Sequence, residues 1–221
     1  CFGVDVARAA GAKPRPVAIE QATPVAPTFE KAADEILKRT GVREGWCLDM
    51  ECGDGSLACE LARKSDLRIV AITSDPVLAR SARARCIAAG LYGDRIMVHE
   101  STPGATAYPP YFADLVVSGA SVLGSADVVD AAAAARVQRP CGGVVCVGKS
   151  GALRVNVRSA LPGAGDWTHQ YADAGNSACS DDTVSTPLVP LWFDDLGQAL
   201  TQRHGRGPSP LYLNGRVFSL G

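Results

Sequence analysis

Residues 46–62 hold the pattern that most constrains the fold of this chain, a short apolar run followed by a glycine-rich turn and a helical stretch. The run from Trp46 to Met50 predicts a buried strand, which breaks at Gly53 and Gly55 before apolar residues recur at helical spacing. Glycines let a ligand approach the backbone, and the free N–H groups at the start of a helix point toward its polar groups. The pattern therefore predicts a ligand site, with the acid Asp49 inside the strand, just before the turn.

Apolar runs and helical stretches alternate along most of the chain. Each predicted strand is almost continuously apolar, which is typical of a parallel sheet with helices on both faces. The right-handed crossover rule then gives a doubly wound α/β fold, whose ligand crevice lies at the carboxyl ends of the strands. The predicted strands are 46–50, 67–73, 95–99, 113–118, 144–148 and 152–158, and the predicted helices are 28–40, 57–62, 76–89 and 125–137.

Local signals define the ends of two of these helices. Thr28 is a candidate N-cap of the first helix, and Gly41 stands where a left-handed C-cap glycine is favoured. In the helix from Pro76, the proline takes the first helical position and Asp75 is a candidate N-cap.

The composition excludes several classes of function. Lys and Arg total 22 against 23 Asp and Glu, so the chain carries no strong signal for nucleic acid or for an acidic membrane. No apolar run approaches the roughly 18 residues that a membrane helix needs. The eight cysteines form no Cys-x-x-Cys pair and have no nearby histidine pattern, so we expect reduced thiols and no metal site.

The strand and turn at 46–62 resemble the first motif of the class I S-adenosylmethionine (SAM) methyltransferases, an acid-x-Gly-x-Gly-x-Gly pattern in which Glu51 here takes the first glycine position. Residues 113–118 resemble the fourth strand of that family, and residues 138–143 resemble its turn before strand five. The resemblance covers about residues 28–158. It implies a Rossmann-like sheet, SAM as the cofactor and transfer of a methyl group to an acceptor that the sequence does not identify.

The resemblance also implies where the cofactor binds. The ribose-binding acid of the family falls on Thr73, two residues before Asp75, which could reach the ribose hydroxyls or cap its helix. The adenine-side acid falls near Ser101. Glu51 would crowd the methionine part of SAM or pair with its ammonium group, or else the site has lost tight binding. The implied cofactor-binding residues are Asp49, Glu51, Cys52, Gly53, Gly55, Thr73, Asp75, Ser101 and Ser118.

Two alternatives follow from the same residues. Gly53-x-Gly55-x-x-Ala58, with Asp75 about 20 residues further on, fits a dinucleotide fingerprint loosely, but Asp49 and the turn at 140–143 favour SAM. The departures at Glu51, Thr73 and Ser101 also fit a non-catalytic Rossmann-like scaffold or sensor.

No catalytic residue is predicted. The sulfonium of SAM is already activated, so methyl transfer depends mainly on in-line positioning of the acceptor. His99, at the end of the third predicted strand, is expected to be structural. Tyr108 and Tyr111, in the loop 102–112, either shape an acceptor pocket or pack on the sheet.

The chain changes character after a linker at 159–166. Residues 167–221 resemble the start of a propeller of the pyrroloquinoline-quinone (PQQ) dehydrogenase type, with a strand at 187–193 and a hairpin at 211–218 about Asn214-Gly215. We therefore expect an extended leader at 1–27, a methyltransferase-like domain at 28–158 and a truncated propeller whose other blades belong to a longer protein. The compartment is not predicted, because SAM chemistry points to the cytoplasm and propellers of this type commonly work outside it.

Overall fold

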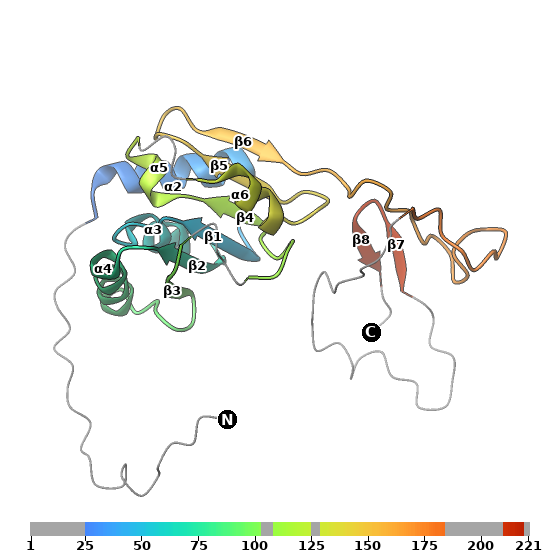
Figure 1. Cartoon of the computed structure of the whole chain (residues 1–221), viewed down its shortest axis with the longest axis horizontal. Coiled ribbons are helices and arrows are strands. Elements are labelled where there is room, and N and C mark those ends of the chain that lie inside the picture. The colour runs from blue at the N-terminus through green and yellow to red at the C-terminus, as the bar shows by residue number, and fades with distance from the viewer. Residues whose placement is uncertain (1–24, 103–107, 125–128, 184–209, 219–221) are drawn as a thin grey trace, which may run out of the picture.

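The computed structural model describes residues 25–102, 108–124, 129–183 and 210–218 (Figure 1). The main body is a six-stranded sheet in the order β3-β2-β1-β4-β5-β6, and a separate two-stranded sheet follows near the end of the chain. The strands of the main sheet are β1 (Trp46–Met50), β2 (Arg68–Thr73), β3 (Ile96–Glu100), β4 (Leu115–Val117), β5 (Val144–Val147) and β6 (Arg154–Val157).

β1 lies at the centre of the sheet, between β2 and β4. Asp49 is opposite Ala71 in β2 and Val117 in β4, and the pairs from β3 through β5 are all parallel. β6 pairs antiparallel with β5 and forms the edge. The mostly parallel sheet is the one predicted from the alternating sequence. Because these strands are parallel, the carboxyl ends of β1 to β4 lie along the same edge of the sheet.

Helices cover both faces of the sheet, as the doubly wound prediction requires. Residues of α2 (Pro27–Thr40), α3 (Ser56–Lys64), α4 (Pro76–Ala88) and the short α5 (Gly119–Val122) join one buried cluster. A second, smaller cluster joins α6 (Ala131–Val137) to Leu48, Val70 and Val116 on the opposite face. Two separate apolar cores therefore hold the central strands in place.

The first helix shows both a confirmed and a wrong prediction. Its apolar stripe is buried as predicted, and Gly41 ends it in the left-handed conformation with φ 69°. Thr28 is not the N-cap, because Pro27 already occupies the first turn and Ala26 is the capping residue, with no side-chain hydrogen bond. Proline is favoured at that position because its missing N–H has no partner within the helix.

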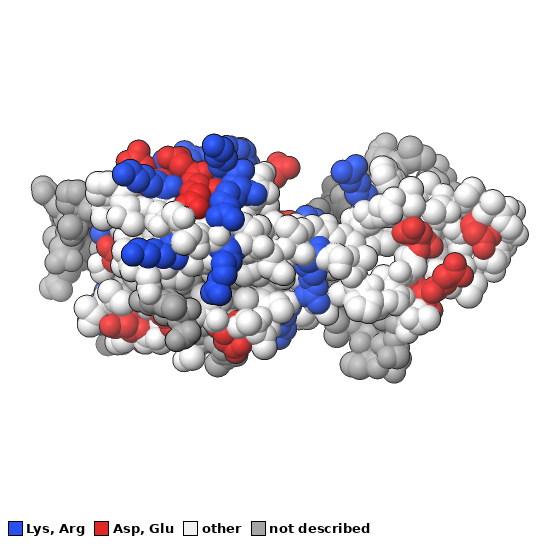
Figure 2. Space-filling view, turned by 90° about the horizontal axis from the view of Figure 1, so that it is seen from above, with Lys and Arg blue, Asp and Glu red and all other residues white. Residues whose placement is uncertain are grey.

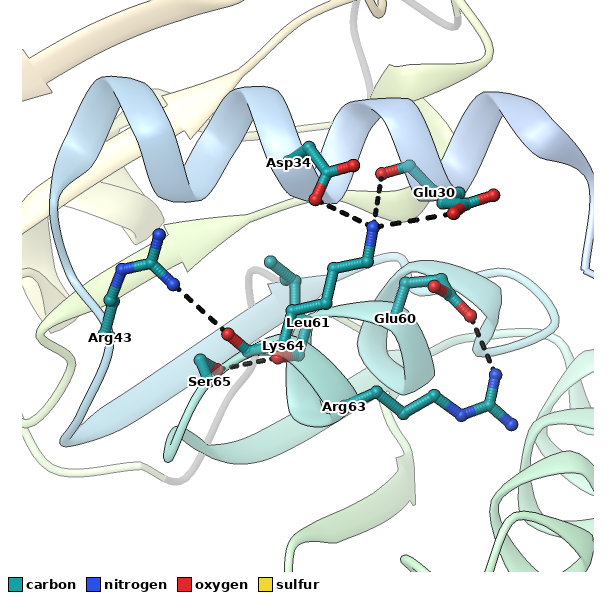
Figure 3. A network of polar contacts seen from close by, with 8 residues as sticks. All are labelled: Glu30, Asp34, Arg43, Glu60, Leu61, Arg63, Lys64 and Ser65. Atoms are coloured by element: carbon teal, nitrogen blue, oxygen red, sulfur yellow. Dashed lines mark hydrogen bonds and ion pairs between the residues drawn. The ribbon is translucent and has the colours of Figure 1, made fainter.

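Charged groups join α2 to α3 at the surface (Figure 3). Lys64 Nζ lies 2.7 Å from Asp34 Oδ1 and 3.9 Å from Glu30 Oε1. Exposed pairs of this kind contribute about 0–1 kcal/mol each. The two helices are therefore held mainly by buried side chains such as Phe29, Ile36 and Leu61.

The face of the molecule seen in Figure 2 carries basic and acidic side chains side by side. The mixture agrees with the near-balance of charges in the sequence.

Several predicted boundaries need correction. The helix predicted at 125–137 is shorter, since Asp130 caps it and α6 begins at Ala131, while residues 125–128 lie outside the described residues. The short helix α5 was not predicted. Trp46 is 42% exposed, because β1 begins at the rim of the sheet, where Arg68 lies over the indole ring.

The hairpin predicted near the end of the chain is confirmed. β7 (Leu211–Leu213) and β8 (Arg216–Phe218) pair antiparallel about Asn214 and Gly215, whose φ values of 50° and 75° suit a type I′ turn. In Figure 1 the hairpin lies apart from the main sheet, below the segment that follows β6. The described residues contain no four-stranded blade, and the strand predicted at 187–193 and most of the leader lie outside them.

Few contacts join the hairpin to the rest of the chain in the described residues. Tyr212 exchanges two backbone hydrogen bonds with Trp167, each 2.8 Å long, and its hydroxyl lies 3.6 Å from Cys141 Sγ. A Cβ added at Gly215 would also collide with Cys141.

None of the helices described is both long and apolar enough to cross a bilayer.

A chain that ends at residue 160 should melt within about 2–4 °C of the full chain, the shift that about 1 kcal/mol produces in a domain of this size. The reason is that an isolated two-stranded hairpin is marginally stable and here adds few contacts to the core. A chain that ends at residue 152 is the control. It removes buried Leu153 and the whole of β6, so its unfolding transition should collapse. Thermal circular dichroism of both chains checks this, and a collapse of the longer one would contradict it.

Candidate functional site

Asp49 connects the central strand to the loop after β4. Its side chain is fully buried, and Oδ1 accepts a hydrogen bond of 2.7 Å from the backbone N–H of Gly119. The second oxygen, Oδ2, is also buried and has no hydrogen-bond partner among the residues that the structure describes. A buried polar atom without a partner costs free energy, and in native structures it needs a specific explanation such as a bound group.

Burial also changes the acidity of this side chain. Desolvation raises the pKa of Asp49 from 3.8 to about 7, with a further upward contribution from the charge of Glu51, while the Gly119 hydrogen bond opposes the shift. The carboxyl therefore exchanges its proton near neutral pH, whereas an exposed aspartate is ionised there.

The turn after β1 is held by backbone hydrogen bonds to two neighbouring elements. Cys52 N–H donates to the carbonyl of Ile72 at the end of β2, and Ala120 N–H donates to the carbonyl of Glu51, at 2.7 and 2.9 Å. Cys52 itself is buried, and its burial raises the pKa of the thiol far above its usual range, so it packs as a neutral group. The turn is thus fixed between the ends of β2 and β4.

The two glycines of the turn have different structural roles. Gly53 has φ 59°, and a Cβ added there would meet no atom within 4 Å, so this position opens onto free space. Gly55 has φ 76°, and its added Cβ would lie 3.0 Å from the Cβ of Ala82 in α4. Gly53 therefore offers the close backbone approach that a ligand needs. Gly55 instead allows α3 to pack against α4.

Asp54, between these glycines, was missed by sequence reasoning. Its Oδ2 lies 2.7 Å from Nη2 of the buried Arg85, and its Oδ1 accepts from Ser56 N–H at the start of α3. Arg85 also donates to the Asp54 carbonyl at 3.1 Å. This pair holds the turn against the start of α3. An acid in a glycine-rich turn, followed by arginines in the next predicted helix, was the sequence pattern that could have predicted the pair.

Glu51 takes an unusual conformation at the first glycine position of the motif. Its φ is 59°, in the left-handed region that favours glycine. Its Oε1 accepts a hydrogen bond of 3.0 Å from the hydroxyl of Ser74, the first residue after β2. The carboxylate of Glu51 is therefore placed at the end of β2, and Ser74 is a second residue that sequence reasoning missed.

The residues predicted after β2 and β3 are close together but differ in accessibility. Thr73 is fully buried, and its Oγ1 accepts from Asp75 N–H. Asp75 is exposed and caps α4, since its Oδ1 accepts from Val77 and Leu78 N–H at 2.7 and 3.3 Å. Ser101 N–H donates to the carbonyl of Thr73 at 3.0 Å. The capping role considered for Asp75 is thus the one observed.

Ser118 and Gly119 form the remaining part of this edge. Ser118 is buried and caps α5, because its Oγ accepts from Ser121 N–H at 3.2 Å. A Cβ added at Gly119 would lie 2.8 Å from the carbonyl oxygen of Cys52, so only glycine allows this contact. Ser118 followed by small residues is a sequence pattern that could have predicted both the N-cap and the short helix α5.

The aromatic residues near β3 pack on the sheet. Tyr108 joins the smaller apolar cluster with Phe112, and its hydroxyl contacts Nδ1 of His99, whose ring it stacks on at a centroid distance of 5.7 Å. Burial raises the pKa of the Tyr108 hydroxyl. The ring of Tyr111 instead lies under the guanidinium of Arg158, at 4.6 Å. Residues 103–107 of this loop lie outside the described residues.

Two hollows lie elsewhere on the molecule. One, of about 480 Å³, lies between the linker and the hairpin and includes Asp166 and Tyr212. The other, of about 470 Å³, lies over β5 and β6 beside α6. The described residues hold no group of three or more His, Cys, Asp or Glu arranged for a metal ion, and their cysteines are free thiols. The nine residues predicted to bind a cofactor lie at or close to the carboxyl ends of β1 to β4, away from both hollows.

Comparison with solved structures gives the fold. A putative SAM-dependent methyltransferase from Methanococcus maripaludis matches at 30% identity with a TM-score of 0.51, over 57% of this chain and 57% of that chain. A putative sarcosine dimethylglycine methyltransferase from Galdieria sulphuraria matches at 25% identity and TM-score 0.43, over 53% of this chain and 43% of that one. A geranyl diphosphate methyltransferase in complex with SAM matches at 17% identity and TM-score 0.45, over 53% and 47%.

The chain thus spans little more than half the length of the methanococcal structure. No protein-family model and no curated protein sequence matches it. The mostly parallel sheet with helices on both faces is the Rossmann-like fold of the class I methyltransferases, as predicted.

Replacing Asp49 with Asn should remove a pH-dependent loss of stability. Because the folded-state pKa is about 7 and the ordinary value is 3.8, the folded state binds the proton more tightly, and the free energy of unfolding falls as pH rises between them. Between about pH 5 and pH 8, the free energy of unfolding of the Asn variant should rise by about 2–3 kcal/mol relative to that of wild type. Each pH unit contributes about 1.4 kcal/mol.

Urea denaturation at several pH values measures this difference. Asp94→Asn, at an exposed carboxyl in the turn before β3, serves as the control and should show no such trend. A difference between Asp49→Asn and wild type that stays constant across this range would contradict the interpretation.

Proposed function

We propose that this chain carries the SAM-binding domain of a methyltransferase and that the site is the edge formed by the ends of β1 to β4. The observation that carries the proposal is the turn after β1, in which Gly53 opens onto free space four residues after the buried acid Asp49. The likeness to the methanococcal SAM-dependent methyltransferase supports it. Open α/β sheets bind their ligands at this edge.

The residues present fit such a ligand. Gly53 leaves room for close approach to the backbone, and the Oδ2 atom of Asp49 is a buried acceptor without a partner in the described residues. Glu51 and Ser101 are partly accessible beside them. We propose that Gly53, Glu51 and Ser101 line the cofactor site, and that buried Asp49 holds the turn in place from within the sheet. Buried Cys52, Thr73 and Ser118, together with Gly55 and the capping Asp75, maintain its shape.

When bound, SAM supplies a methyl group already activated by its sulfonium. The chain's own task is then to hold the two reacting groups in line. The Asp49–Gly119 hydrogen bond fixes the β1 and β4 loops relative to each other, and the Asp54–Arg85 pair fixes the start of α3. The acceptor stays unidentified, and no side chain is assigned as a general base.

We also propose that residues 167–221 form part of a PQQ-like propeller. What supports this is the sequence resemblance and the hairpin at 211–218.

The non-catalytic scaffold is the alternative to a methyltransferase, and ligand binding separates the two. A scaffold without a cofactor would give no heat with S-adenosylhomocysteine, the demethylated product of SAM.

Isothermal titration with S-adenosylhomocysteine tests the proposal, using two glycine variants matched in backbone and surroundings. Gly53 and Gly90 both have positive φ, 59° and 70°, and an added Cβ at either meets no atom within 4 Å. Each change to Ala should cost about 1 kcal/mol of stability from the left-handed backbone. Gly53→Ala should also weaken binding at least about tenfold, which corresponds to about 1.4 kcal/mol.

Gly90→Ala, at the end of α4, should bind as wild type does. Wild-type protein that shows no heat at millimolar S-adenosylhomocysteine would refute the proposed function. Equal loss of affinity in both variants would mean that the turn after β1 is not the site.

A further inference from the structure

We propose that the carboxylate of Glu51 binds the ribose hydroxyls of the cofactor, a role that the position of Glu51 in the chain does not suggest. This inference rests on the proposed function, since it concerns the same site. It assigns to the end of β1 a contact that β2 does not provide.

The backbone of Glu51 is the first evidence. A non-glycine residue at φ 59° is held in a conformation that costs of order 1–3 kcal/mol, and such residues cluster at functional sites. A glycine in the same place would remove this cost. A glutamate at this position therefore destabilises the fold relative to glycine. This points to a functional role for its carboxylate.

The direction of the side chain is the second evidence. Glu51 follows β1, yet its Oε1 accepts from the Ser74 hydroxyl just after β2. The side chain thus reaches from the end of β1 to the end of the adjacent parallel strand β2, at the sheet edge where open α/β sheets bind their ligands. The hydrogen bonds of the described residues leave its Oε2 without a donor, and a ligand hydroxyl can supply one.

The third argument comes from β2 and the residues after it, where the position expected for the ribose is buried and the nearest carboxylate already caps a helix. Thr73 is 0% exposed, so an acid in its place would be buried in the sheet. Asp75 is exposed, but its Oδ1 holds two N–H groups at the start of α4. A vicinal diol donates hydrogen bonds, and a carboxylate at the end of a strand is the acceptor that α/β nucleotide sites use for ribose. Glu51 supplies such a carboxylate from the end of the neighbouring strand, β1.

The contrasting assignment is that Glu51 pairs with the ammonium group of the methionine part. Ligands that lack one group or the other separate the two. 5′-Methylthioadenosine keeps the ribose diol and has no ammonium group, and its 2′,3′-dideoxy analogue lacks both. The dissociation constants of S-adenosylhomocysteine and these two ligands are measured by calorimetry for wild type, Glu51→Gln and Glu44→Gln. Glu44 is an exposed glutamate before β1 and is the matched control.

Glu51→Gln should weaken S-adenosylhomocysteine and 5′-methylthioadenosine by the same factor, about tenfold or more, because one charge-assisted hydrogen bond is lost from each. It should leave binding of the dideoxy analogue unchanged, and Glu44→Gln should change none of the three. Loss with S-adenosylhomocysteine alone would assign Glu51 to the ammonium group and overturn the inference. An equal loss with the dideoxy analogue, or no loss with any ligand, would also overturn it.

Two results separate this inference from the proposed function. Unaffected, tight binding of S-adenosylhomocysteine by Glu51→Gln would overturn the inference alone, whereas no binding by wild type would overturn both. Glu51→Gly adds a stability readout. It should raise the melting temperature by about 2–4 °C through release of the left-handed strain, while weakening the diol ligands. Tighter binding by this variant would mean that Glu51 obstructs the site.

Discussion

The hydrogen bond between Asp49 and Gly119 is the interaction on which the candidate site depends. It joins two segments that lie 70 residues apart in the chain and brings the loop after β4 against the turn after β1. The contact between Gly119 and the Cys52 carbonyl and the bond from Ala120 to Glu51 join the same two loops beside it. It leaves the other oxygen of this buried carboxyl without a partner in the described part of the chain, and buried polar groups of this kind cluster at functional sites.

The sequence predicted the parts of this arrangement that depend on local chemistry. β1 has the bounds that its apolar run indicates, Gly41 and Asp75 cap the helices where they were expected to, and the Asn214-Gly215 hairpin forms. Each of these signals acts within a few residues, through backbone conformation or a single side-chain hydrogen bond. The doubly wound, mostly parallel sheet followed from the alternation of strands and helices and from the right-handed crossover rule.

What the sequence could not predict depends on neighbours distant in the chain. Glu51 reads as an obstruction at a glycine position until its hydrogen bond to Ser74 shows that its carboxylate lies at the end of the adjacent strand. Thr73 reads as the ribose position until its complete burial is known. Gly55 reads as a ligand contact, but the space it leaves is filled by Ala82. In each case the deciding atom belongs to another element.

The approach of Gly55 to Ala82 has a consequence for how this domain can diverge. The two residues share one small volume between the turn and α4, and a larger side chain at either position would have to be offset by a change at the other. Related chains should therefore vary these positions together or keep both small. A substitution in the middle of α4 would then alter ligand affinity without contacting the ligand, because the turn moves with the helix against which it packs.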